Sequence, residues 1–139
     1  MNFKSYKEAV LSYYEELWNE KNKSYIDLLF DDEITFRGSL NVETKGKKEF
    51  EKYMDNVNQG LPNLYHGVEM MVCENNLISA KVHYHGTHTG KLFKLEATNK
   101  TIRYSGASFF QFRNKKIVNI WVLGDLINLY KQLDVKDII

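Results

Sequence analysis

Two alternating apolar segments near the C-terminal end of the chain constrain its fold most strongly. In residues 105–112 and 117–123, apolar side chains recur at about every second position, and the polar turn 113–116 separates the two segments. Such alternation around a short turn is typical of two antiparallel β-strands joined by a hairpin. Gly124-Asp125 then interrupts the second strand, and residues 126–133 predict a short terminal helix.

The segments before this hairpin predict helices first and strands afterwards. Residues 4–21 carry apolar side chains at helical spacing, which favours an amphipathic helix. This order predicts an α+β fold, with N-terminal helices packed on one face of a strongly curved antiparallel sheet. The other expected elements are helices at 25–30 (with Ser24 as N-cap) and 47–57, a loop at 38–46, and strands at 33–37, 66–73, 77–89, 92–95 and 101–112.

The composition permits one core with an internal pocket. At 139 residues, folding buries roughly two-thirds of the unfolded surface. Aromatic residues make up 14% of the chain, and such rings fill cores or line cavities for flat apolar ligands. The chain contains no repeat, low-complexity tract or linker, so residues 1–139 are expected to form a single domain.

Charge and cysteine content disfavour several classes of protein. The net charge is +1, from 19 basic and 18 acidic residues that are interspersed along the chain. Nucleic-acid binding needs a basic face, which this distribution does not predict. The single Cys73 cannot form an internal disulfide. The N-terminal residues contain no apolar signal segment, and no stretch approaches the roughly 18 apolar residues of a membrane helix. We therefore expect a cytoplasmic protein that binds neither nucleic acid nor a membrane.

Several short motifs, taken in order, resemble a known family. They include Leu17-Trp18-Asn19 at the end of the first helix, the segment 86–90 (GTHTG), Trp121 and Asp125. Their order and spacing resemble the nuclear-transport-factor-2-like cone and, within it, the SnoaL-like polyketide cyclase or ester cyclase family. The resemblance implies helices on a curved sheet that encloses an apolar pocket, a small apolar molecule as ligand, and a homodimer formed by the outer sheet face. Further motifs that carry it are residues 28–32 (LLFDD), Gly46, Pro62, the turn 97–100, Gly106 and Gln132-Leu133.

The chain departs from these enzymes at the positions of their catalytic residues. The acid/base carboxylate of the polyketide cyclases corresponds to Val122 here, and its histidine partner corresponds to Ser108. The general base of ketosteroid isomerases, which share the fold, falls near Arg37. The resemblance thus implies that neither catalytic set is present.

Two residues remain as catalytic candidates, Asp125 and His88. Desolvation near an apolar pocket raises the pKa of a carboxylate, which suits proton transfer at neutral pH. A neutral imidazole could act as a base or polarise a carbonyl group. Each candidate has a structural alternative, because Asp125 can cap the terminal helix and His88 can be held by the backbone at a strand bend.

Alternation along the strands predicts the pocket wall. If Val122 faces inward, then Val118 and Ile120 do so as well, while Phe109 and Trp121 face outward. A phenol from the first helix could donate a hydrogen bond to a bound molecule. The expected substrate-binding residues are Tyr14, Trp18, Phe36, Met54, Ser108, Phe110 and Val122.

The outer face offers a further, weaker motif. His83 and His85 share this face, and His-x-His on a strand can bind a metal, but no third ligand is evident, so we expect no metal and no cofactor. For function, we expect a small-molecule enzyme of the cyclase, isomerase or dehydratase type that moves a proton on an apolar or aromatic substrate. The alternatives are a non-catalytic binding protein for a small hydrophobic ligand and a structural dimer whose own side chains fill the cavity.

Overall fold

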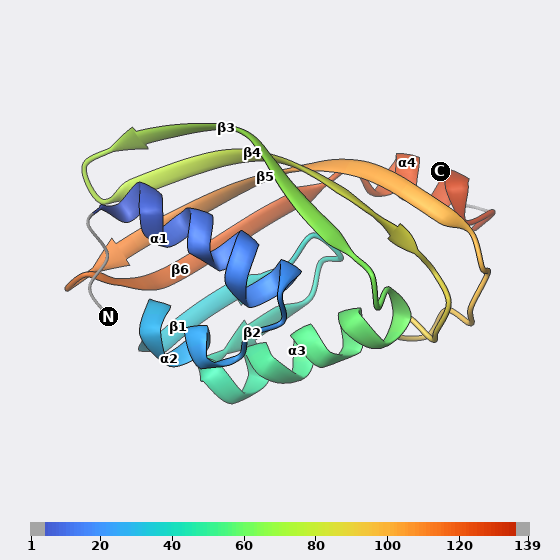
Figure 1. Ribbon diagram of the computed structural model, residues 1–139, viewed down its shortest axis with the longest axis horizontal. Coiled ribbons are helices and arrows are strands. Elements are labelled where there is room, and N and C mark those ends of the chain that lie inside the picture. The colour runs from blue at the N-terminus through green and yellow to red at the C-terminus, as the bar shows by residue number, and fades with distance from the viewer. Residues whose placement is uncertain (1–4, 136–139) are drawn as a thin grey trace.

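The computed structural model describes residues 5–135 and has the predicted α+β architecture. Six strands form one curved sheet, and α1, α2 and α3 lie along one side of it (Figure 1). The strand order is β2-β1-β6-β5-β4-β3. The elements are α1 (Tyr6–Ser12), η1 (Tyr13–Asn19), α2 (Ser24–Leu29), β1 (Phe30–Arg37), β2 (Glu43–Lys45), α3 (Gly46–Gly60), β3 (Tyr65–Glu74), β4 (Leu77–Thr87), β5 (Thr101–Arg113), β6 (Lys116–Gly124) and α4 (Leu126–Gln132).

The sheet is antiparallel except at one junction. β1 pairs with β6 in the parallel sense, whereas the other neighbouring strands are antiparallel. The predicted all-antiparallel sheet is wrong at that junction, because β1 comes from the N-terminal half of the chain and adds beside the last strand of the meander. This pairing brings Phe36 next to Ile120 and continues the inner face of β6 onto β1.

The predicted hairpin of β5 and β6 is confirmed in its pairing. Ser108 lies opposite Val122, and both side chains are buried. A register shift between Gln111 and Phe112 turns Ile117, instead of the predicted Val118, toward the core. A bulge of this kind exchanges the faces of the residues beyond it, so the strict alternation expected from the sequence ends there.

The N-terminal helix contains a feature that its apolar spacing did not predict. α1 begins after Ser5, whose side chain accepts a hydrogen bond from the Glu8 amide at 3.1 Å, and it continues as the π-helix η1. The wider turn is marked by the Glu20 amide, which donates to the Glu15 carbonyl at 3.1 Å. π-Helical turns are rare and often lie at functional sites. Here the π-helix buries four side chains together: Tyr13, Tyr14, Leu17 and Trp18.

Three smaller expectations from the sequence are wrong. Ser24 lies inside α2 with Lys23 at the N-cap position, because the Asn22 side chain accepts from the Ser24 amide at 3.2 Å. The expected loop 38–46 contains β2, which pairs with the end of β1. The expected strand 92–95 is only an isolated bridge between Leu92 and Leu95.

The core lies between the helices and the inner face of the sheet, and it is rich in aromatic rings. Phe50, at the centre, is fully buried and meets the rings of Phe30 and Phe36 edge-on, with centroids 4.8 and 4.9 Å away. Edge-to-face pairs are a favoured packing geometry for aromatic side chains. Within residues 5–135, no helix is both long enough and apolar enough to cross a membrane.

Candidate functional site

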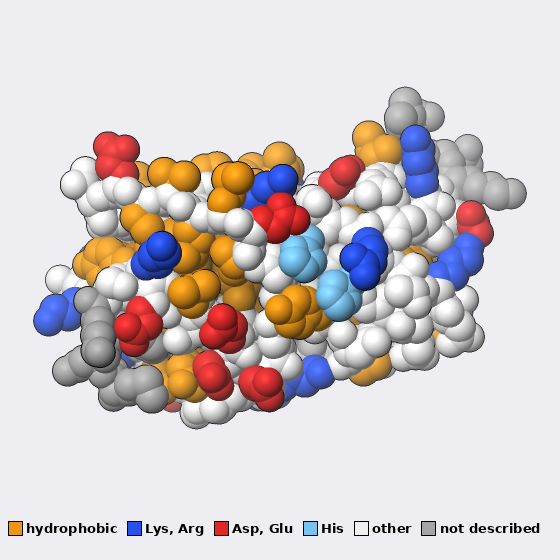
Figure 2. Space-filling view, turned by 45° about the horizontal axis from the view of Figure 1, so that its top comes forward, with side chains coloured by type: hydrophobic (Ala, Val, Ile, Leu, Met, Phe, Trp, Pro, Cys, Tyr) orange, Lys and Arg blue, Asp and Glu red, His pale blue; other side chains and the backbone are white. Residues whose placement is uncertain are grey.

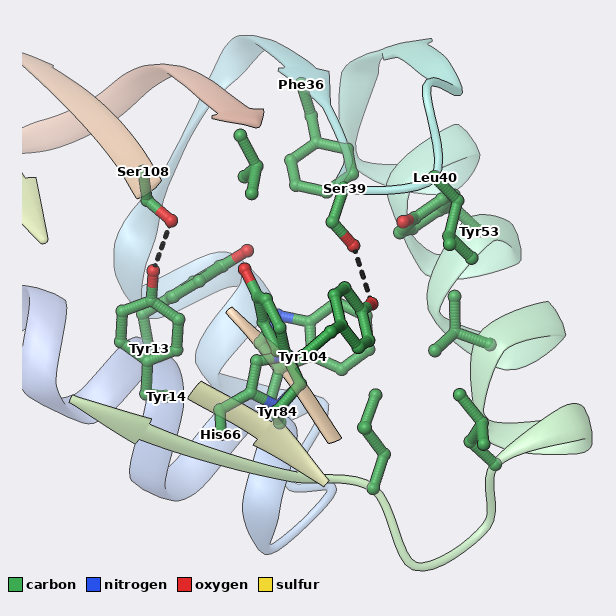
Figure 3. A pocket seen from close by; sticks show the side chains of 15 residues that line it. Tyr13, Tyr14, Phe36, Ser39, Leu40, Tyr53, His66, Tyr84, Tyr104 and Ser108 are labelled. Atoms are coloured by element: carbon green, nitrogen blue, oxygen red, sulfur yellow. Dashed lines mark hydrogen bonds between the residues drawn. The ribbon is translucent and has the colours of Figure 1, made fainter. Parts of the chain in front are cut away.

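An internal cavity lies between η1, α3 and the inner face of the sheet (Figure 3). The space between atoms here is about 430 Å³ when the part that opens to solvent is counted, but the volume open to the centre of a water molecule is only about 30 Å³. That smaller volume holds roughly two waters. The lining residues are Tyr13, Tyr14, Trp18, Phe36, Ser39, Leu40, Tyr53, Val57, Leu61, Leu64, His66, Tyr84, Tyr104, Ser108 and Val122.

Two residues mark the side of the cavity that solvent reaches. Ser39 and Leu40, in the connection between β1 and β2, are half-buried, whereas all other lining side chains are buried. Loops at the end of a sheet can move more readily than the strands that they join. The lining of the cavity is therefore nearest to solvent at this connection.

Five of the lining residues are tyrosines, and burial keeps their phenols neutral. Desolvation raises the pKa of Tyr13, Tyr14, Tyr53 and Tyr84, and it raises the pKa of Tyr104 to about 12. A neutral phenol can donate or accept one hydrogen bond. The cavity wall is thus apolar in area, with hydroxyl groups placed at intervals along it.

Two of these phenols are already hydrogen-bonded to serine hydroxyls, as Figure 3 shows. Tyr14 Oη donates to Ser108 Oγ at 2.7 Å, which links η1 to β5. Tyr104 Oη and Ser39 Oγ are 3.0 Å apart. Ser108, at the position that the resemblance gives to a catalytic histidine, therefore serves as a hydrogen-bond partner of Tyr14.

Gly106 provides the room that the Tyr84 ring occupies. A Cβ atom at Gly106 would lie 2.5 Å from Tyr84 Oη and 2.7 Å from Tyr84 Cε2, closer than real side chains approach. The absent side chain lets the Tyr84 ring lie flat over β5, where its centroid is 4.6 Å from that of Tyr104.

His66, at the start of β3, is the imidazole that the structure places in the cavity. Its ring centroid lies 4.9 Å from Trp18, 5.1 Å from Tyr84 and 5.7 Å from Tyr14. Burial lowers the pKa of His66 from its ordinary value of 6.5 to about 3, so the ring is neutral near pH 7. A neutral imidazole offers one N–H and one acceptor nitrogen.

The backbone of His66 is held from both sides by one amide side chain. The His66 N–H donates to Asn19 Oδ1 at 2.8 Å, and Asn19 Nδ2 donates to the His66 carbonyl at 2.9 Å. Asn19 is the last residue of η1 and follows Trp18 directly. The π-helix and β3 are therefore locked together where the Trp18 and His66 rings meet.

Five of the predicted binding residues line the cavity: Tyr14, Trp18, Phe36, Ser108 and Val122. Met54 and Phe110 do not. Both are fully buried, and neither borders this cavity. Periodicity identifies an inward face, but it does not separate residues that border a cavity from those packed behind it.

Asp125 lies outside the cavity and caps α4. Its carboxylate accepts a hydrogen bond from the Asn128 amide at 3.2 Å, and its side chain is exposed. Its backbone N–H also donates to the Ser105 carbonyl at 2.9 Å. The structure thus favours the capping alternative, and Asp125 is not carried into the site.

His88 is fully buried, yet it is not among the cavity-lining residues. Its Nδ1 accepts from the Thr98 amide at 3.3 Å and lies 3.0 Å from Thr98 Oγ1. Its backbone is paired as well, through Lys100 and Asn99. These contacts fasten the connection between β4 and β5 and assign His88 to the framework.

Sequence reasoning missed His66, Tyr13, Tyr53, Tyr84 and Tyr104 as lining residues. Alternation along β4 does place Tyr84 on the inner face, so that signal was present. The sequence contains no such alternation around His66, because β3 is an edge strand with apolar residues at some of its outward positions as well. Helical periodicity places Tyr13 and Tyr53 on the inward faces of their helices, but it does not separate them from the packed core as cavity residues.

The outer face of the sheet is different in character. Phe109, Trp121 and Leu123 are 50, 41 and 52% exposed, and the Phe109 and Trp121 rings are 6.0 Å apart. Figure 2 shows hydrophobic side chains gathered beside two neighbouring histidines on the surface. His83 and His85 stack on each other, with centroids 6.0 Å apart. Among the described residues, no group of three or more His, Cys, Asp or Glu could hold a metal.

Two comparisons with known proteins give a match: a family model shows the family, and solved structures show the same fold. The family model described as SnoaL-like polyketide cyclase matches residues 8–133. Among solved structures, TsrD from Streptomyces laurentii is similar at 15% identity, with a TM-score of 0.84 over 97% of this chain and 98% of that one. A SnoaL-like polyketide cyclase from Agrobacterium tumefaciens is similar at 17% identity, with a TM-score of 0.79 over 94 and 99% of the two chains. Among curated protein sequences, none matches the chain.

Proposed function

The chain belongs to the SnoaL-like polyketide cyclase family, and from that premise we propose that it binds a small, uncharged aromatic or polyketide-like molecule in the tyrosine-lined cavity. The observation that carries the proposal is the chemistry of the wall. The lining residues contain aromatic and aliphatic side chains, hydroxyls and a neutral imidazole, and among these described residues there is no carboxylate, lysine or arginine. Burying a charged ligand there would leave its charge unpaired, which is costly.

The shape of the wall favours a flat molecule. Tyr13 and Tyr14 meet at 79°, and Tyr53 meets Phe36 at 60°, so ring faces and ring edges both border the space. Aromatic rings attract one another in offset-stacked and edge-to-face arrangements. A planar apolar ligand could use both kinds of contact at once.

Ligand binding requires some side chains to move. Sites for small molecules usually span about 300–1,000 Å³, far more than the 30 Å³ now open to water centres. The half-buried Leu40 at the solvent side is the side chain best placed to swing out. This requirement supports ligands at the small end of the range, with one or two rings.

The wall also favours binding over carboxylate-driven catalysis. By resemblance, Val122 and Ser108 occupy the positions at which the polyketide cyclases carry their acid/base pair. Asp125 lies outside the cavity and caps α4. A second candidate, proton-transfer catalysis, is supported by one observation, the presence of the His66 ring in the cavity. Its low pKa of about 3 makes it a weak base at pH 7, because general bases work best when their pKa lies near the working pH.

Matched substitutions on one strand test the proposal. Val122→Phe fills the cavity, whereas Val118→Phe on the same strand adds the same bulk to the half-buried outer side. With acetophenone and ethylbenzene as probes, titration calorimetry should show binding to the wild type and to Val118→Phe, and loss of binding in Val122→Phe. Absence of binding to the wild type at millimolar probe, or wild-type affinity in Val122→Phe, would overturn the proposal. Chromatography of the incubated probes separates binding from turnover.

We also propose that a second copy of the chain covers the outer sheet face. Large exposed apolar patches usually mark interfaces, and Phe109, Trp121 and Leu123 form one on the outer face of β5 and β6. A patch centred on two adjacent strands can meet its own copy across a two-fold axis. Light scattering should give a dimer for the wild type and for Thr101→Lys, and a monomer for Phe109→Lys. A monomeric wild type at micromolar concentration would contradict this assembly.

A further inference from the structure

We infer that Trp18 and His66 together form a binding site for a ligand carbonyl oxygen, so that the molecule accepted by the cavity is an uncharged aryl ketone or a similar aromatic carbonyl compound. This inference rests on the proposed function, since it names the chemical class of the molecule that the cavity holds. It differs from the acid/base pair expected by resemblance, because neither residue stands at those positions.

Two buried polar atoms without an ordinary hydrogen bond point to this site. Neither Trp18 Nε1 nor His66 Nδ1 makes a hydrogen bond of ordinary geometry, although Trp18 is only 4% and His66 only 7% exposed. Burial raises the pKa of Tyr13, and its phenol lies close enough to the Trp18 N–H for that contact to lower the pKa in part, so Tyr13 is the protein group that a ligand oxygen would compete with there. Nearly all buried polar groups in proteins are paired, and each exception needs an explanation. Both side chains line the same cavity, and their ring centroids are 4.9 Å apart.

The other unpaired atoms show that position in the cavity is the discriminating feature. Thr44 Oγ1 and His88 Nε2 also lack partners, but neither residue lines the cavity. A molecule in the cavity would lie beside the Trp18 and His66 rings and could meet both atoms after the side-chain movements that binding requires, whereas Thr44 and His88 do not border the cavity. The cavity wall therefore contains two neighbouring nitrogen-bearing rings whose Nε1 and Nδ1 atoms make no ordinary hydrogen bond, beside phenols of which two are bonded to serines.

The donor chemistry of the pair selects an oxygen acceptor. The indole N–H of Trp18 can only donate, and the neutral His66 ring can donate from one nitrogen and accept at the other. A carbonyl oxygen has two lone pairs and no proton, so it can accept from Trp18 and from the imidazole N–H at the same time. A hydrocarbon would leave both atoms unpaired, and a carboxylate would bring a charge that the described lining residues cannot neutralise.

The pair is held in place before any ligand arrives. Asn19 follows Trp18 in the chain and binds the His66 backbone through two hydrogen bonds of 2.8 and 2.9 Å. One side chain thus fixes the distance between η1 and β3 where the two rings meet. Groups positioned in advance lose little freedom on binding, which favours both affinity and selectivity.

The test follows the Trp18 indole N–H by nuclear magnetic resonance during titration with acetophenone and with ethylbenzene, a hydrocarbon of similar shape. The chain has two tryptophans, and Trp121 on the outer face serves as an internal control whose signal a Trp121→Phe variant identifies. Acetophenone should move the Trp18 indole proton downfield, as a new hydrogen bond does, and ethylbenzene should not. The Trp121 signal should respond to neither probe.

Variants test the same inference through affinity. The ratio of ketone affinity to hydrocarbon affinity should fall about tenfold in Trp18→Phe and in His66→Phe, the effect of losing one net hydrogen bond. Using the ratio removes the difference in hydrophobicity between the probes. If one variant fails to fold, the other variant and the wild-type indole signal still decide the matter.

The possible failures are distinguishable. If both probes bind in the cavity but the Trp18 signal and the affinity ratio do not depend on the carbonyl group, the carbonyl site is refuted and the proposed cavity binding stands. The same result is expected if water molecules, and not the ligand, accept the hydrogen bonds of Trp18 and His66. If neither probe binds, the proposed function fails, and the inference that rests on it fails too.

Discussion

Two buried histidines, His66 and His88, lie in regions that differ in one decisive respect. The His88 Nδ1 is hydrogen-bonded to Thr98 at the β4–β5 connection and its backbone is paired, so only its Nε2, which does not border the cavity, lacks a partner. The His66 backbone is held by Asn19, but its ring faces the cavity with Nδ1 unpaired. Burial alone therefore does not identify a functional histidine. A ring left free while its backbone is fixed is the more informative sign.

The comparison predicts the largest loss of stability at the framework histidine. His88→Leu would leave the Thr98 amide without an acceptor inside the protein, and we expect it to lower the free energy of unfolding by about 2–4 kcal/mol. His88→Asn is the matched control, because its side-chain oxygen can take the place of Nδ1 and should recover part of the loss. Urea denaturation measures both. A loss below about 1 kcal/mol for His88→Leu would contradict the framework role.

The cavity histidine should instead appear in the pH dependence of stability. Burial lowers the pKa of His66 to about 3, so between pH 6.5 and 3 the unfolded chain binds a proton there that the folded chain does not. Stability is therefore complete above pH 6.5 and falls with decreasing pH by up to about 1.4 kcal/mol per unit, or roughly 2 kcal/mol by pH 5. Unfolding curves of the wild type and His66→Phe measure the difference. An unchanged slope in the variant would contradict a neutral, buried His66.

Asp125 tests whether the other candidate from the sequence belongs to the framework. Asp125→Ala removes the acceptor for the Asn128 amide and should cost about 1 kcal/mol, whereas Asp125→Asn retains a cap and should be nearly neutral. Neither change should alter probe affinity, because the side chain does not line the cavity. Calorimetric titration of both variants with acetophenone checks this, and a weakened affinity in Asp125→Asn would return the residue to the site.

The smallest effect on stability is expected at His66 itself. His66→Phe removes an unpaired polar nitrogen and adds bulk beside empty space, and these opposing effects should leave the protein within about 1 kcal/mol of wild type at neutral pH. Urea denaturation at pH 7.5 compares it with His88→Leu. A loss as large as that of His88→Leu would make the two histidines equivalent and remove the basis of the comparison.

Much of the fold could be predicted from the sequence because its strands alternate strongly. The hairpin followed from periodicity, and the placement of the helices on one sheet face followed from the order of the elements. The parallel junction between β1 and β6 did not, because no local pattern records which distant strand becomes a neighbour. The register shift between Gln111 and Phe112 also left no local signal in the sequence. Because of this shift, Ile117 faces the core in place of Val118.

The candidate site was predictable only in part, for related reasons. Tyr14, Trp18 and Ser108 were expected at the cavity from their faces, and the structure places them there. His66 was not expected there, because what places it at the cavity is its contact with three rings from other elements, Tyr14 and Trp18 of η1 and Tyr84 of β4. His88 and Asp125 were singled out by residue type and motif, whereas their hydrogen-bond partners, Thr98 and Asn128, determine what each one does.

The most direct test of the account is a crystal structure of the protein soaked with acetophenone. In that structure the phenyl ring should lie among the cavity tyrosines, and the carbonyl oxygen should lie within about 3.2 Å of both Trp18 Nε1 and a nitrogen of the His66 ring. A ligand found in the cavity with its oxygen turned away from this pair, or water on both atoms with the ligand elsewhere, would contradict it.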